Sequence, residues 1–164
     1  MTNIVNTKSF TLTQGGADTA AETTIATNLL PGIDMSAWEL LEVEFTLKPD
    51  IVKAWAAADS DLTIQFTKRS LSGSVARIIT YTDTDLLFTW NVAIVLSGTA
   101  ANIWIQPTTF NVKLPEGLIV YAENLYGQII SSATGQTNVA WGRILYRPIK
   151  LTASEAMLLI ASRP

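Results

Sequence analysis

The sequence contains no cysteine and no histidine. The absence of cysteine excludes disulfide bonds, thiolate chemistry and cysteine-ligated metal sites. The absence of histidine removes the most common general base together with the most common transition-metal ligand. Any catalysis would therefore depend on carboxylates, on serine with lysine, on tyrosine, or on a metal bound through oxygen.

Charge is also scarce. Charged residues make up 15% of the 164 residues, whereas apolar residues make up 48%. Soluble domains usually carry about a quarter charged residues, so part of this poorly charged surface is suited to contact with other chains, and we expect an oligomer. The net charge of −3, the pI near 4.8 and the lack of any basic run longer than Lys68-Arg69 predict no nucleic-acid binding through a basic segment.

Long apolar runs and targeting signals are missing as well. The sequence has no stretch of 18 or more apolar residues, which predicts no membrane-spanning helix. Its beginning lacks a basic segment followed by an apolar one, so we expect no signal peptide. The length suits a single domain with one sizeable core.

Residues 1–36 differ in composition from the rest of the chain. They hold eight threonines and four charged residues, with short β-like patches at 9–13 and 24–30 separated by a Gly/Ala-rich stretch. We interpret residues 1–36 as an extended polar N-terminal arm or an edge hairpin. Residues 37–164 then form the main β domain, which begins after the turn signal Leu30-Pro31-Gly32.

Alternating apolar and polar residues predict strands along most of that domain. The runs at 41–48 and 62–67 alternate cleanly and predict half-buried strands. Residues 86–96 carry apolar side chains on both parities, which predicts a central strand covered on both sides. Further strands are expected at 77–82, 103–106, 110–114, 118–125 and 137–152.

Two segments depart from the β pattern. Ile51 and Trp55, four residues apart with alanines beside them, predict a short helix near 50–58. Thr152 and Glu155 match a capping box and predict one or two helical turns at the C-terminus. Eight or nine short strands without a long helix indicate an all-β, two-sheet antiparallel sandwich, and the strand count favours a single jelly roll of about eight strands over an immunoglobulin-type sandwich.

No arrangement of residues indicates an enzyme. The sequence lacks the motif G-x-S-x-G and a phosphate-binding loop, and it suggests no carboxylate pair placed across a cleft. Two aspartate pairs in turns have the oxygen ligands that Ca²⁺ prefers. Neither pair lies in a loop with the glycine and terminal glutamate of a specific calcium site. Aspartate in a turn also forms hydrogen bonds with its own backbone, and we favour this structural role over metal binding. The weak metal candidates are Asp59, Asp61, Asp83 and Asp85.

The last strand, residues 137–152, has apolar and polar groups on both parities. A bulge at Gly142 or at residues 147–148 would reconcile this pattern with one buried face. A second interpretation places the strand at an inter-subunit surface, where arginine and aromatic residues are enriched. Trp104 has the opposite parity to its isoleucine neighbours, so it is also a candidate for an interface. The interface candidates are Trp104, Trp141, Arg143 and Arg147.

The order of these features resembles single jelly-roll virion proteins of non-enveloped viruses and phages. The strand runs ELLEVEFTL, DLTIQFT, LLFTWNVAIVL and GLIVYAENL carry the resemblance, together with the expected helix after the first of them. It implies a capsid protein that self-assembles as a shell, vertex or decoration subunit of the virion, with copies of itself and other virion proteins as partners. Many such proteins that wrap single-stranded genomes have a basic arm. The nearly neutral residues 1–36 are expected to strap neighbouring subunits instead.

The alternative is a carbohydrate- or receptor-binding β-sandwich module, secreted or on a cell surface. The chain has five tryptophans and four tyrosines, and exposed aromatics on a sandwich can form a platform for sugar rings. Trp90 lies in the apolar register of its strand and is expected in the core, as are most of the tryptophans. The shell hypothesis predicts stoichiometric self-assembly through large apolar interfaces that involve residues 1–36 and the C-terminal tail. The binding module predicts a cluster of exposed aromatics and binding as a monomer or trimer.

Overall fold

The structure is a computed structural model that describes residues 4–14, 20–33, 35–47, 60–71, 82–94, 109–131 and 138–161. The helix expected near 50–58, the strand expected at 103–106 and most of that expected at 77–82 lie outside the described residues. The described residues form nine strands and one helix. The elements are β1 (Asn6–Gln14), β2 (Ala21–Ala26), β3 (Ser36–Leu47), β4 (Ser60–Thr67), β5 (Leu86–Ile94), β6 (Thr109–Lys113), β7 (Ile119–Val120), β8 (Asn124–Ser131), β9 (Asn138–Lys150) and α2 (Ala153–Ala161).

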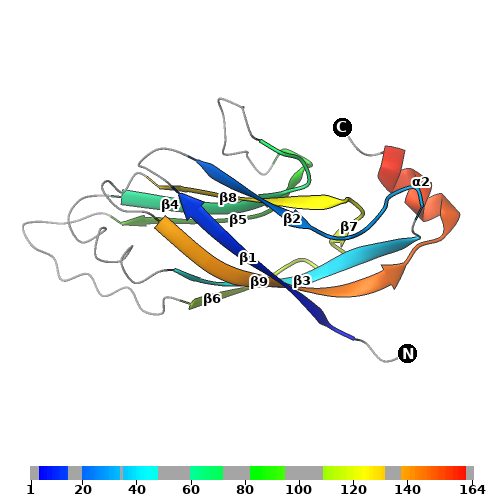
Figure 1. Ribbon diagram of the computed structural model, residues 1–164, viewed down its shortest axis with the longest axis horizontal. Helices are drawn as coiled ribbons and strands as arrows, with labels where there is room; N and C mark the ends of the chain where they lie inside the picture. The colour runs from blue at the N-terminus through cyan, green and yellow to red at the C-terminus, as the bar shows by residue number, and fades with distance from the viewer. Residues whose placement is uncertain are drawn as a thin grey trace, which may run out of the picture.

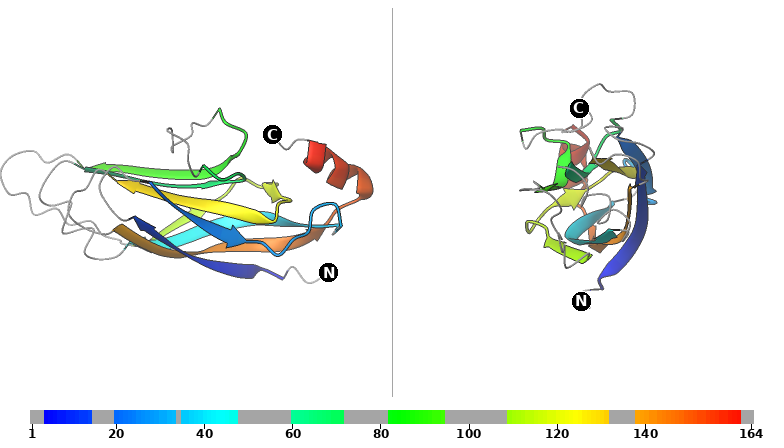
Figure 2. Two further views of the ribbon diagram at one scale, coloured as in Figure 1. Left: turned by 45° about the horizontal axis from the view of Figure 1, so that its top comes forward. Right: turned by 90° about the vertical axis from the view of Figure 1, so that its left-hand side faces the viewer.

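The strands form two antiparallel sheets that lie face to face (Figures 1 and 2). Sheet A has the order β1-β9-β3-β6, with β7 also paired to β3, and sheet B has the order β2-β8-β4-β5. Successive strands lie in opposite sheets in three places, between β1 and β2, between β3 and β4, and between β8 and β9. The chain therefore winds back and forth between the two sheets. This winding confirms the predicted jelly-roll sandwich. The prediction that residues 86–96 form a central strand is wrong for the described part of the chain, in which β5 ends the order of sheet B and pairs with β4 alone.

The core lies between the two sheets and follows from the alternation along each strand. Phe45 of sheet A meets Phe88 and Trp90 of sheet B edge-on, with ring centroids 6.5 and 5.1 Å apart. Trp90 also packs against Phe110, with a centroid distance of 4.6 Å, so its predicted core position is confirmed. The aromatic rings therefore join the two sheets at the centre of the sandwich.

The N-terminal segment is part of the sandwich, which corrects the arm proposed for residues 1–36. β1 is an edge strand of sheet A beside β9, and β2 is an edge strand of sheet B beside β8. Phe10, Leu12 and Ile25 are buried in the common core. The physical reason is the period-two alternation of these side chains with threonine, which gives each strand one apolar face.

The bulge expected in the last strand lies instead in its neighbour. β9 pairs with β3 along its length, and the register shifts between Leu40 and Glu42 of β3. Ala140 and Ile144 of β9 face the core, whereas Trp141 on the other parity is exposed. The extra residue in β3 lets its apolar side chains on both sides of the bulge face the core, so β9 needs no irregularity of its own.

The capping box at the C-terminus is confirmed and starts α2. The Thr152 backbone N–H donates to Oε2 of Glu155 at 2.7 Å, and the Glu155 N–H donates to Oγ1 of Thr152 at 3.3 Å. These bonds from the Thr152 backbone and hydroxyl hold the pKa of Glu155 below its ordinary value. α2 then packs against the end of the sandwich through Ala156, which lies in a small cluster with Tyr121 and Leu151.

Two glycines make room for this packing, one in each sheet, and they allow a matched test. A Cβ at Gly142 would lie 2.5 Å from Cζ of Phe10 and would also clash with the backbone oxygen of Glu44, which cannot move without disturbing β3. We expect Gly142→Ala to lower the free energy of unfolding by about 1–3 kcal/mol, measured by urea denaturation. Gly127→Ala should cost less, because its Cβ would meet only the movable side-chain ends of Leu12 and Phe66. Equal losses for the two variants would contradict this account.

A second test concerns the N-terminal strands. A chain that begins at Trp38 lacks β1 and β2, so it leaves the core open along one edge of each sheet. We expect this truncated chain to lose the cooperative thermal transition of the full chain in circular dichroism and to be degraded by a protease that spares the full chain. A chain that begins at Ile4 is the control. A truncated chain that melts at the wild-type temperature would restore the arm interpretation.

Candidate functional surfaces

The outer face of sheet A carries an exposed tryptophan in a polar surrounding. Trp141 of β9 is 45% exposed and lies opposite Thr11 of β1 on one side and Thr46 of β3 on the other. Thr109 of β6 continues the row, and its hydroxyl lies 2.9 Å from that of Thr46. We name this surface the Trp141 face. It consists of Ser9, Thr11, Glu44, Thr46, Thr109, Trp141 and Arg143.

Both arginines predicted as interface candidates form cross-strand ion pairs with β3. Arg143 donates through Nε to Glu44, and Arg147 donates through Nε to Glu39 at 2.8 Å. The hydrogen bond to the Glu44 carboxylate, followed by its charge, raises the pKa of Arg143. Each arginine lies directly opposite its glutamate in the register of the sheet, so both charges are paired. Trp104, the remaining interface candidate, lies outside the described residues.

The Trp141 face is hollowed at its centre. A shallow depression of about 360 Å³ lies over the strands β1, β9, β3 and β6. Trp141, the Arg143–Glu44 pair and the hydroxyl groups of Ser9, Thr46 and Thr109 line it, so it offers one aromatic ring together with hydrogen-bond donors and acceptors.

Of the predicted metal ligands, Asp83 and Asp85 are brought together, and an arginine lies between them. Arg69 donates through Nε to Asp85 at 2.5 Å and through a terminal nitrogen to Asp83 at 3.0 Å. The Asp85 backbone N–H donates to Asp83 at 2.9 Å, which is the bond within a turn that the sequence favoured. The backbone bond first, and then the Arg69 guanidinium, hold the pKa of Asp83 below its ordinary value.

Asp61, a third metal candidate, does not join this cluster. Asp61 lies exposed on β4, opposite Ala93 of β5, and Asp59 lies outside the described residues. Within the described ranges, no group of three or more acidic side chains gathers in a way that would hold a metal ion. The bonds of Asp83 and Asp85 to Arg69 join the turn before β5 to the end of β4.

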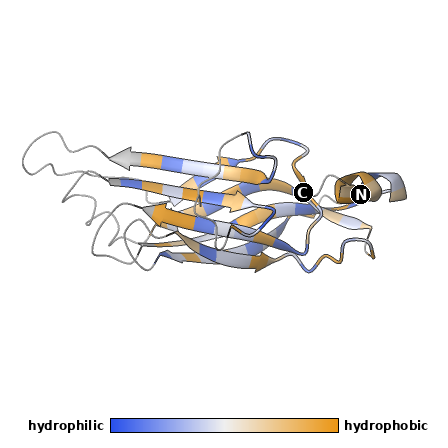
Figure 3. Cartoon of the chain, turned by 90° about the horizontal axis from the view of Figure 1, so that it is seen from above, coloured by the Kyte–Doolittle hydropathy of each residue, from blue (hydrophilic) through white to orange (hydrophobic). Residues whose placement is uncertain are grey.

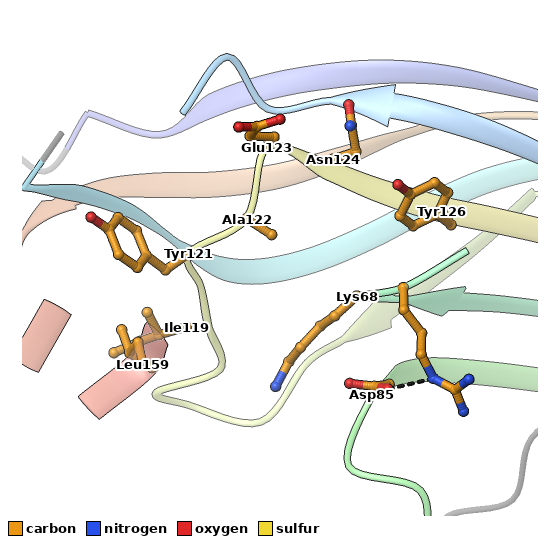
Figure 4. A pocket seen from close by; sticks show the side chains of 10 residues that line it. Lys68, Asp85, Ile119, Tyr121, Ala122, Glu123, Asn124, Tyr126 and Leu159 are labelled. Carbon is orange, nitrogen blue, oxygen red and sulfur yellow. Dashed lines mark hydrogen bonds and ion pairs between the residues drawn. The ribbon is translucent and has the colours of Figure 1, made fainter. Parts of the chain in front are cut away.

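A second hollow, of about 380 Å³, adjoins this cluster and reaches α2 (Figure 4). Lys68 extends into it from the end of β4, close to the Arg69–Asp85 pair, and Tyr126 and Glu123 border it on the side of β8. Leu159 of α2 closes it at the end of the sandwich. The hollow carries both signs of charge, and it joins the end of sheet B to the helix.

The loop after β2 and the helix α2 lie at the same end of the sandwich (Figures 1 and 3). Both carry exposed apolar side chains. The loop after β2 and the helix both meet Tyr121: the Gly32 N–H donates to its hydroxyl at 2.8 Å, and Ala156 packs in the same cluster. Exposed side chains surround this contact, with exposed fractions between 40% and 76%. We name this surface the apolar end. It consists of Leu30, Ile33, Met35, Met157, Leu158 and Ile160.

The sequence analysis expected apolar interfaces that involve residues 1–36 and the C-terminal tail, and the apolar end contains residues of both segments, but the sequence did not single out these side chains. One local signal was present, because the residues that follow the capping box, AMLLIA, contain no charge that would mark a solvated face. The apolar residues of the loop give no such signal, because the loop is distant from α2 in the sequence and lies near it only in the folded chain. Among the residues that the structure describes, no helix is both long and apolar enough to span a bilayer.

Comparisons with known proteins show the fold. No protein-family model matches the chain, and no curated protein matches it in sequence. A solved structure of Merkel cell polyomavirus VP1 in complex with 3'-sialyllactosamine matches with a TM-score of 0.54 and 5% sequence identity. The match covers 90% of this chain and 96% of that chain, so nearly the whole chain shares the arrangement of a viral capsid protein.

The aspartate cluster makes stability depend on pH. Because the pKa of Asp83 is lower in the folded chain than in the unfolded chain, its ionised form stabilises the fold above a pH of about 4, and this stabilisation is lost as the pH falls through the lower folded value. We expect Asp83→Asn to reduce the difference in melting temperature between neutral and acid solution. Glu116→Gln, in the exposed turn before β7, is the control and should retain the wild-type difference. An unchanged difference in Asp83→Asn would contradict the role of the Arg69 cluster.

Proposed function

We propose that the chain is a structural, non-enzymatic protein of a virion, in which jelly-roll sandwiches associate as shell, vertex or decoration subunits of a capsid. The likeness to a viral capsid protein over nearly the whole chain supports this proposal. The observation that carries it is the apolar end, where six large apolar side chains are exposed on a folded sandwich. An exposed apolar patch of this kind marks a contact with another protein.

The helix at the apolar end requires a partner for its exposed side. α2 has nine residues, and Ala156 is its one buried residue. A helix of this length is marginal without tertiary packing, even with the capping box. Met157 and Leu158 are 72% and 70% exposed, and burial of such a side chain contributes about 1.5–3 kcal/mol. Covering the helix would therefore stabilise both the interface and α2 itself.

A second copy of this chain fits the apolar end. Residues 156–161 of α2 and 29–33 of the loop contain no charged side chain, so these two segments bring no charge to a contact between two such surfaces. An interface that uses the same patch on both subunits is the usual form of a dimer contact. The hollow under Leu159 continues the patch and adds polar groups at its rim, as in ordinary interfaces. In this proposal α2 shares with the loop at the end of residues 1–36 the strapping role that the sequence analysis gave to that segment.

The association of purified chains tests the proposal. We expect the wild-type chain to sediment as a defined dimer, because an interface that uses the same patch on both subunits closes at two copies. Leu158→Glu should shift the distribution to monomer, because the interface would then bury an unpaired carboxylate. Ser154→Glu adds the same charge to an exposed polar position of the same helix, and it should leave the association unchanged.

Two results would contradict the proposal. A wild-type chain that stays monomeric at high concentration would exclude assembly driven by the chain alone. Oligomers that persist in Leu158→Glu would exclude the apolar end as the contact. Circular dichroism of each variant, with the wild-type spectrum as reference, separates loss of association from loss of folding.

A further inference from the structure

The Trp141 face differs in chemistry from the apolar end. Among the described residues, Trp141 is the one aromatic side chain that is exposed, while Trp38 is buried and Trp90 is half-buried in the core. An exposed tryptophan offers a large, rigid apolar plane on a protein surface. Its position in the middle of sheet A, between Thr11 and Thr46, keeps that plane on a rigid element of the fold.

The neighbours of Trp141 are suited to hydroxyl groups. Trp141 lies in a cross-strand row with two threonines. Two residues further along each strand, a second row on the same face places Ser9 of β1, Arg143 of β9 and Glu44 of β3 side by side. Hydroxyl side chains both donate and accept hydrogen bonds. The ion pair supplies strong donors and acceptors held in a fixed place. A ligand that combines an apolar ring face with several hydroxyl groups would match this arrangement.

We propose that the Trp141 face binds a neutral carbohydrate, with one pyranose ring lying against the indole of Trp141. The depression of about 360 Å³ is at the small end of the range for ligand sites and accommodates one or two sugar rings. The hydroxyl groups of the sugar bond to the Arg143–Glu44 pair and to the Ser9, Thr46 and Thr109 hydroxyls that line the depression. This inference is independent of the proposed assembly.

The same residues disfavour other ligand classes. A protein interface requires a continuous apolar centre, whereas Trp141 is the one exposed large apolar side chain in this lining, because Phe45, which also borders the depression, is buried in the core. A phosphate or an acidic sugar requires an available cation, whereas Arg143 is already paired with Glu44, and the chain has a net charge of −3. The Arg143–Glu44 pair carries no net charge and presents hydrogen-bond donors and acceptors together. This combination suits an uncharged polyol, whose hydroxyl groups both donate and accept hydrogen bonds.

Binding of a defined panel of soluble sugars to the full chain tests the proposal. The panel contains cellobiose, mannobiose, lactose, N-acetyllactosamine and 3'-sialyllactose, and binding is measured by saturation-transfer NMR and titration to millimolar concentration. We expect saturable binding of at least one neutral disaccharide. Trp141→Ala should weaken it about tenfold, because loss of an aromatic contact costs about 1 kcal/mol or slightly more. Trp141→Phe, which keeps an aromatic ring, should retain most of the affinity.

The controls address folding and the site. Trp141 is exposed, so both variants should keep the wild-type melting temperature, and Thr24→Ala, exposed on β2 of the other sheet, should bind as the wild type does. Glu44→Gln removes the neutralising charge and should weaken binding of the neutral sugar. The proposal is overturned if no neutral sugar binds, if 3'-sialyllactose alone binds, or if Trp141→Ala binds as tightly as the wild type.

Discussion

The contact between Phe10 and Gly142 determines how the N-terminal strand is held. Because Gly142 has no side chain, the Phe10 ring lies against the backbone of β9. The same ring meets Phe66 of sheet B edge-on, with centroids 5.0 Å apart. One side chain of an edge strand thus contacts both sheets, which makes a segment of unusual composition a structural part of the jelly roll. β1 in turn supplies one side of the Trp141 face.

The bulge in β3 determines which charges face outward. Arg143 and Arg147 have the same parity in the regular strand β9, whereas their partners Glu44 and Glu39 have opposite parity in β3. In an unbulged pair of strands, one glutamate would point into the core without its arginine, at the cost of a buried unpaired charge. The extra residue between Leu40 and Glu42 places both glutamates opposite their arginines. The polar character of the outer face therefore depends on one irregularity.

Local patterns predicted what local forces determine, which includes most of the described strands, the sandwich and the capping box of α2. The single strand expected at 118–125 is wrong, because the chain bends at 122–123 between β7 and β8. They did not reveal pairings between distant segments. The alternation of Phe10 and Leu12 within a threonine-rich segment was read as an arm, because its partner β9 lies at the other end of the chain. The irregular pattern of β9 allows either a bulge in that strand or an inter-subunit surface, whereas the bulge lies in β3. The aspartate pair at 83 and 85 was recognised as a turn, but Arg69 was not foreseen as its partner.

The two candidate surfaces occupy different parts of the sandwich, the apolar end at the strand termini and the Trp141 face on the outer side of sheet A (Figure 1). Apolar side chains without charge gain most from another apolar surface, so the end is suited to a second copy of the chain. A single ring among hydroxyl groups gains little from such a surface, because the hydroxyl groups would lose their bonds to water without replacement. A polyhydroxylated ligand replaces those bonds while it covers the ring. The partners proposed for the two surfaces therefore differ in chemistry, an apolar protein surface at the apolar end and a polyhydroxylated ligand at the Trp141 face.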